Sequence, residues 1–215
     1  MDLLIVTAAY AVTYLGARLL GSSYAGLCAL LACLAVATWR LAAAQSSWRD
    51  LGFRVPGSWL RTVLWTLALL VATALVGALI INPLARAAEW PPMDLSRVAG
   101  LRGNWHALMA WLLLAWTSAA LAEELVFRAF LISRLQMIFG SAPLGTALTV
   151  LVQAACFGAA HFYLGQRGVA TAMAVGILYG AVYLRSGRNL PALMLAHGTT
   201  DSLSLVALYF GAAAG

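Results

Sequence analysis

Five ionisable side chains lie inside long apolar stretches of this 215-residue chain, where charge is unexpected. They are Glu123, Glu124, His161, His197 and Asp201. Each charge placed in a bilayer costs about 3 kcal/mol or more, so such residues need partners, water or a chemical role. A carboxylate can act as a general base, and histidines can orient a water, donate to an oxyanion or bind a metal. Together these residue types are suited to hydrolysis.

The spacing of these residues supplies partners for them. Glu124 and Arg128 are four residues apart and would share one helix face. Glu123 would point about 100° away from Glu124 and so face a different neighbour. His197 and Asp201 are also four residues apart. Hydrolysis of a peptide bond within a membrane needs a water held by a carboxylate and donors for the developing oxyanion, and this set contains both kinds of group.

The elements that must position these side chains are membrane helices. Hydrophobic residues make up 63% of the chain and charged residues only 9%, whereas a soluble domain usually carries about 25% charged residues. A membrane helix needs about 20 mostly apolar residues. We therefore predict an all-α, polytopic membrane helix bundle that forms a single domain over residues 1–215. Its seven expected spans are Leu3–Leu20, Tyr24–Ala44, Leu60–Leu84, His106–Phe127, Leu144–Phe162, Val169–Leu184 and Leu190–Phe210.

The number and depth of the spans stay open at this point. The fourth span continues as an amphipathic stretch to about Phe139, and the fifth and sixth are short, so an eighth helix or a re-entrant segment is an alternative. If the sixth span crosses fully, the fifth and seventh run parallel. His161 and His197 then meet only if the helix ends are shifted or if residues 162–168 dip into the membrane.

The positive charge of the chain predicts contact with lipid rather than with nucleic acid. The net charge of +6 comes entirely from arginine, and the arginines sit mostly at span ends, where they anchor helices against anionic headgroups. Nucleic-acid binding would need them clustered with interleaved aromatic residues. The small-residue spacing of Gly176 and Gly180 favours close helix packing and leaves an oligomer open as a second interpretation.

The order of three motifs resembles that of a known family. The CPBP family, also called Abi, contains CAAX-prenyl endopeptidases and bacteriocin-processing or self-immunity proteins. The resemblance covers roughly residues 105–210, and Asp50-Leu-Gly-Phe53 is similar to an element often found upstream in the family. The three motifs are Glu123-Glu124-x-x-x-Arg128, Phe157-x-x-x-His161 and His197-x-x-x-Asp201.

This resemblance implies an integral membrane endopeptidase, expected in a bacterial plasma membrane, that cleaves a membrane-associated peptide or protein. By position, Glu123 and His161 would activate the water, and Glu124 and Arg128 would position the other groups. His197 and Asp201 would stabilise the oxyanion or help to bind a metal such as zinc. Both roles are open because the family has been described both as metal-dependent and as a glutamate-type protease without metal. The last motif position is often asparagine in the family, and Asp201 differs from it because a carboxylate donates no hydrogen bond unless protonated.

Other functions are compatible with buried charges in apolar spans. A structural ion-pair network can hold helices together, and a proton-coupled transporter also needs intramembrane carboxylates and histidines. A non-proteolytic membrane scaffold or a bacteriocin-immunity protein is a further alternative within the resemblance. Cleavage of a membrane peptide by the purified protein distinguishes the protease from all of these.

Overall fold

The computed structural model describes residues 1–211, and these residues form helices and no strand. The expected all-α, polytopic helix bundle is therefore confirmed. The predicted single domain extends over residues 212–215 as well, and these four lie outside the described residues. The α-helices are α1 (Asp2–Leu19), α2 (Ala25–Ala43), α3 (Trp59–Val76), α4 (Asn82–Ala87), α5 (Trp105–Leu114), α6 (Ile132–Phe139), α7 (Pro143–Ala160), α8 (Gly165–Arg185) and α9 (Leu190–Tyr209).

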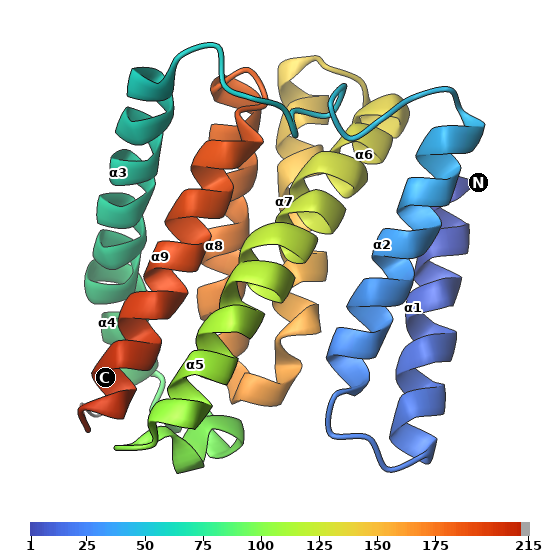
Figure 1. The fold of residues 1–215 in the computed structure, drawn as a ribbon. Coiled ribbons are helices and arrows are strands. Elements are labelled where there is room, and N and C mark those ends of the chain that lie inside the picture. The colour runs from blue at the N-terminus through green and yellow to red at the C-terminus, as the bar shows by residue number, and fades with distance from the viewer. Residues whose placement is uncertain (212–215) are drawn as a thin grey trace.

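Four π-helical and 3-10 segments complete the helical path. The π-helical segments η1 (Gly77–Ile81) and η3 (Ala115–Leu131) join α3 to α4 and α5 to α6 without a break. The 3-10 segments η2 (Ser96–Leu101) and η4 (Phe162–Leu164) lie in the connections before α5 and α8. Figure 1 shows α1 and α2 at one side of the bundle and α3 at the other, with the long path through α5, η3 and α6 crossing obliquely between them.

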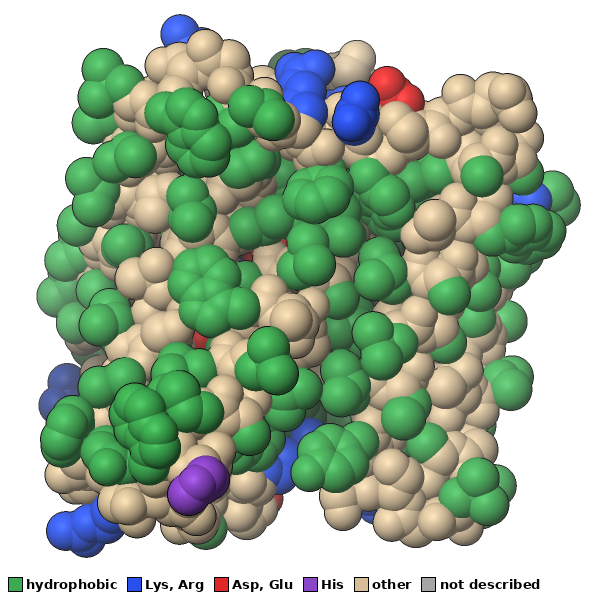
Figure 2. Space-filling view, viewed as in Figure 1, with side chains coloured by type: hydrophobic (Ala, Val, Ile, Leu, Met, Phe, Trp, Pro, Cys, Tyr) green, Lys and Arg blue, Asp and Glu red, His purple; other side chains and the backbone are tan. Residues whose placement is uncertain are grey.

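Six helical stretches in the described part of the chain are long and apolar enough to cross a membrane. Helix α9, predicted as a seventh span, is not among these six, because histidine, threonine, aspartate and serine side chains dilute its apolar residues. It nevertheless runs the length of the bundle, where it packs against η3 and α3 (Figure 1). Figure 2 shows hydrophobic side chains covering the flank of the bundle, as expected of a lipid-facing surface.

Local sequence explains where the helices begin and end. The side chains of Ser58, Asn104 and Asn189 accept hydrogen bonds from backbone N–H groups in the first turns of α3, α5 and α9, which is the ordinary role of these residue types at a helix start. Pro143 lies in the first turn of α7, where no intrahelical N–H is needed. Gly140 ends α6 with φ of 79°, a backbone conformation that disfavours other residues.

The sixth predicted span began too late. Helix α8 starts at Gly165 rather than Val169, and the apolar stretch that contains it covers 24 residues, Phe162–Arg185. Gln166 and Arg167 obscured this start, because polar residues at a helix end break the apolar pattern. The fifth helix correspondingly ends at Ala160 instead of Phe162. The 3-10 segment η4 makes a short turn between two helices that are each long enough to cross a membrane.

The helix that carries the glutamates is unusually long. Trp105–Phe139 comprises 35 continuous helical residues, about 52 Å at 1.5 Å per residue, which exceeds a hydrocarbon core of about 30 Å and fits its oblique course (Figure 1). In its middle the hydroxyls of Thr117 and Ser118 each donate to a carbonyl four residues earlier, at 2.7 Å. Such bonds bend helices, and π-helical geometry is often found at functional sites.

Candidate active site

An ion pair buried inside η3 fixes one half of the candidate site. The Arg128 Nη1 atom lies 3.1 Å from Glu124 Oε1, and both side chains have an exposed fraction of 0%. His197 reaches the same oxygen from α9, with its Nδ1 at 2.8 Å. Because an ionised carboxylate only accepts hydrogen bonds, this nitrogen carries the proton and donates it to Glu124. Asp201 lies one turn further along α9, with its Oδ2 at 3.7 Å from His197 Nε2.

We call Glu124, Arg128, His197 and Asp201 the charge cluster. Phe157 of α7 forms one wall of it. The Arg128 guanidinium carbon lies 3.9 Å from the centre of the Phe157 ring, a cation–π distance. The same ring lies 6.3 Å from the His197 ring and 4.6 Å from the His161 ring, measured between centroids. The second motif therefore meets the other two through this phenylalanine.

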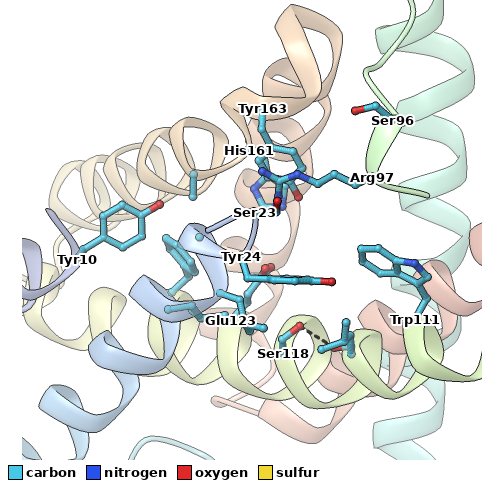
Figure 3. Close-up of a pocket in the computed structure, with 16 residues that line it drawn as sticks. Tyr10, Ser23, Tyr24, Ser96, Arg97, Trp111, Ser118, Glu123, His161 and Tyr163 are labelled. Carbon is cyan, nitrogen blue, oxygen red and sulfur yellow. Dashed lines mark hydrogen bonds between the residues drawn. The ribbon is translucent and has the colours of Figure 1, made fainter. Parts of the chain in front are cut away.

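Glu123, the neighbour of Glu124 on η3, lines a cavity of about 490 Å³. His161 lines the same cavity, across from Glu123 in Figure 3, together with residues from α1, α2 and the connection before α5. The Oε2 atom of Glu123 is buried, and no described residue donates a hydrogen bond to it. A buried polar oxygen without a protein donor is normally satisfied by an ordered water, so Glu123 is suited to hold one beside the cavity.

His161 stands at the C-terminal end of α7 with a defined orientation. Its Nδ1 lies 2.8 Å from the Phe157 carbonyl oxygen, so this nitrogen is the donor and Nε2 of the neutral ring is left as an acceptor. The ring stacks on Tyr163 at 6.0 Å between centroids. The sequence left open how His161 and His197 could approach each other. In the structure His161 lies at the very end of α7, and the Phe157 ring contacts both histidine rings.

An arginine reaches over the cavity from the connection before α5 (Figure 3). The Arg97 guanidinium carbon lies 4.0 Å from the centre of the Tyr163 ring. The ring covers the flat face of the guanidinium, and the N–H groups at the edge of the guanidinium can still donate to an anionic group. The backbone N–H of Asp94 donates to the Leu164 carbonyl at 3.1 Å and attaches this connection to η4. The Ser96 backbone N–H donates to Asp94 and holds the pKa of that carboxyl below its ordinary value.

The structure thus arranges the six predicted site residues as two adjoining groups. Glu123 and His161 line the cavity, whereas Glu124, Arg128, His197 and Asp201 form the charge cluster and are not among the residues that line it. The sequence did not single out other polar lining residues, among them Tyr10, Ser118, Arg97 and Tyr163. Tyr163 follows His161 by two positions and Ser118 precedes Glu123 by five on the same helix, whereas Tyr10 and Arg97 come from elements whose proximity no spacing reveals.

Zinc takes three or four nitrogen, sulfur or oxygen ligands in proteins. Within residues 1–211, no three histidine, cysteine, aspartate or glutamate side chains are grouped so that they could hold a metal ion. The side chains in this arrangement do not fit a zinc site, so the chemistry considered below is that of the side chains alone.

The fold and the site define a class of protein: an integral membrane helix bundle with a carboxylate and a histidine facing a cavity among its spans. Residues 104–203 match the model of the family described as type II CAAX prenyl endopeptidase Rce1-like. The match confirms the resemblance to CAAX-prenyl endopeptidases and points to a peptidase. No curated protein and no solved structure gives a significant match to the chain.

Proposed function

We propose that this protein is an endopeptidase that hydrolyses a peptide bond of a membrane-associated protein or peptide, within a bacterial plasma membrane. The observation that supports this most directly is the unpartnered Glu123 oxygen in a cavity that His161 also lines. The peptidase family covers both residues and the whole charge cluster. Peptide hydrolysis needs a base beside a site that a water and a substrate carbonyl can enter, and Glu123 has that position.

In the proposed reaction Glu123 takes a proton from a water in the cavity, and His161 Nε2 accepts the water's other hydrogen bond. The water oxygen attacks the carbonyl carbon of the substrate and forms a tetrahedral intermediate. The C–N bond then breaks, and the proton held by Glu123 passes to the leaving amine nitrogen. The second proton of the water stays on the new carboxyl group, so the products are a carboxylic acid and an amine. Transfer of that proton to the amine gives a carboxylate and an ammonium group, and atoms and charge balance.

The charge cluster would support this reaction by orienting His197. Glu124, held by Arg128, fixes the His197 ring through Nδ1. In its protonated form His197 also carries an Nε2–H, which can donate toward Asp201 or toward an oxyanion that forms nearby. Glu124 and Arg128 are positioning residues in this scheme, because they act through His197.

The proposal is tested by incubating the purified protein with a library of membrane peptides and identifying products by mass spectrometry. We expect cleavage at internal peptide bonds without any ion gradient. Liposomes containing the protein provide the competing readout. Proton-driven uptake without cleavage would identify a transporter, and neither activity would favour a scaffold or immunity protein; both results contradict the proposal.

The contribution of Asp201 is predicted to be small. Its carboxylate lies 3.7 Å from His197 Nε2, beyond ordinary hydrogen-bond length. Replacing it with an amide of the same shape therefore removes no hydrogen bond to His197. We expect Asp201→Asn to lose far less than the roughly hundredfold that removal of a general acid or base causes. Initial rates of peptide cleavage measure this, with Asp201→Leu as the apolar control. A loss in Asp201→Asn as large as that in Glu123→Gln would show that the charge of Asp201 is essential.

A further inference from the structure

A second polar pocket, of about 410 Å³, lies at the end of the bundle opposite to the cavity of Glu123. It is enclosed by the connection before α3 and by the connection between α8 and α9, both at the upper end of Figure 1, whereas the α7–α8 turn and the start of α5 lie at the lower end. Three arginines line it. Its lining residues include Arg54, Arg61 and Arg188 with Ser58, Ser186 and Asn189.

No described carboxylate forms an ion pair within 4 Å with any of these three arginines, and Arg54 has only a weaker, longer-range attraction to Asp50. The ion pairs of arginine found within residues 1–211 involve Arg40, Arg128 and Arg134 instead. Arg188 donates one hydrogen bond, at 3.3 Å, to the neutral side chain of Gln136. The pocket therefore has an excess of positive charge available to a ligand.

Asp50, in the connection before α3, is hydrogen-bonded within its own turn. Its Oδ2 atom accepts from the Ser47 backbone N–H at 2.8 Å and from the hydroxyls of Ser46 and Ser47. The Ser47 backbone hydrogen bond lowers the pKa of Asp50 below its ordinary value. Its oxygen is thus occupied by these donors rather than by an arginine of the pocket.

The shape of the pocket is built into the packing of its two connections. Gly52 has φ of 98°, and any side chain at this position would collide with the Arg188 carbonyl oxygen. The Tyr183 hydroxyl donates to the Leu51 carbonyl at 2.6 Å, and the Arg188 backbone N–H donates to the Tyr183 carbonyl at 2.8 Å. Arg188 is held with φ of 63°, which is uncommon for a residue other than glycine and is typical of positions that the surrounding structure fixes. This close packing is also a role for Asp50-Leu-Gly-Phe53 that the candidate active site did not explain.

Two helix starts and an apolar border indicate the chemistry of the ligand. Helices α3 and α9 both begin at the pocket, after Ser58 and Asn189, so their positive ends add to the field of the arginines. The Asn189 amide donates to the Thr62 hydroxyl at 2.9 Å and ties the two starts together. Beside the pocket, Trp59 and Leu60 of α3 are 59% and 72% exposed. Arginines and helix starts select an anion, and the adjacent apolar side chains favour one that carries acyl chains.

We propose that this pocket binds the phosphate of an anionic phospholipid headgroup. Arginine matches phosphate oxygens with paired N–H donors, and basic pockets between membrane helices are suited to anionic headgroups. In Figure 2, blue side chains gather at this end, above the hydrophobic flank, which is where a headgroup would lie. The site is separate from the candidate active site, so the proposal does not depend on endopeptidase activity.

The test compares two variants that lose the same charge. Arg54→Gln/Arg61→Gln alters the pocket, and Arg18→Gln/Arg86→Gln removes two arginines at the ends of α1 and α4. Arg188 is kept, because its backbone conformation and its bond to Gln136 make a folding defect a risk. Each full-length protein, in neutral detergent, is titrated with phosphatidylglycerol, phosphatidylcholine or inorganic phosphate, and bound lipid is counted by native mass spectrometry alongside Tm.

We expect phosphatidylglycerol to remain bound to the unmodified protein and to raise its Tm. Phosphatidylcholine should neither remain bound nor raise the Tm. The pocket variant should bind phosphatidylglycerol about thirtyfold more weakly, the factor for two arginine contacts near an anionic surface, and the control variant should bind it normally. Equal binding by the pocket variant, or an equal loss in the control, would overturn the proposal. If inorganic phosphate raises the Tm as much as phosphatidylglycerol does and displaces the bound lipid, the pocket is a site for free phosphate, and the phospholipid proposal is wrong.

Discussion

Replacing Glu123 with glutamine is expected to reduce peptide cleavage by about 10²–10⁴-fold, the usual contribution of a general base. Glutamine keeps the size and the acceptor oxygen of the side chain but cannot take a proton. The Glu123 Oε2 atom has no donor among the described residues, so the substitution breaks no hydrogen bond of the fold there. The protein should therefore elute and melt like the unmodified one. Single-turnover cleavage of a membrane peptide measures the effect.

A matched control is available in the same chain. Glu89 lies in the connection after α4 and is exposed, so Glu89→Gln removes one carboxylate without touching the cavity and should retain full activity. Full cleavage by the Glu123→Gln protein would exclude Glu123 as the base and would make His161, which lines the same cavity, the next candidate.

Replacing Arg128 with alanine is expected to have the largest effect on folding. It leaves the fully buried Glu124 carboxylate without its arginine, and breaking one half of a buried pair costs about 3–5 kcal/mol. The substitution also removes the contact with the Phe157 ring. We expect a sharp fall in folded, monodisperse yield, measured by size-exclusion chromatography, and a lower Tm in whatever protein remains.

Two further variants separate charge from packing. Arg86→Ala, at an exposed arginine of α4, should leave the yield unchanged. Arg128→Met together with Glu124→Gln removes both charges while it fills similar volume, and replacing a buried pair in this way is often neutral or stabilising. Normal yield of Arg128→Ala, or no recovery in the double variant, would argue against a stranded Glu124 as the cause.

The helices were largely predictable because a membrane imposes a minimum length of apolar sequence. The seventh predicted segment begins at Leu190, as observed, because Asn189 and Pro191 mark a helix start. The start of α8 was missed because Gln166 and Arg167 extend a membrane helix beyond its apolar part. The π-helical geometry of η3 was also missed, since hydrogen-bond register leaves no trace in hydropathy.

The site was predictable within helices and much less so between them. The spacing of four residues between Glu124 and Arg128 gave their ion pair directly. The contact of His197 with Glu124 depends on the relative depth of α9 and η3, which no spacing within one helix contains. The catalytic roles of Glu123, His161 and Asp201 remain predictions, because geometry shows where they lie but not what they do during a reaction.

The position of Phe157 makes the two halves of the site energetically interdependent. One ring contacts the Arg128 guanidinium of η3, the His197 ring of α9 and the His161 ring at the end of its own helix. Free-energy changes from substitutions that share such a neighbour usually do not add, with coupling energies of about 0.5–3 kcal/mol. Sequence change at any one of these positions therefore alters which residues the other two tolerate, so the three motifs are constrained to vary as one unit.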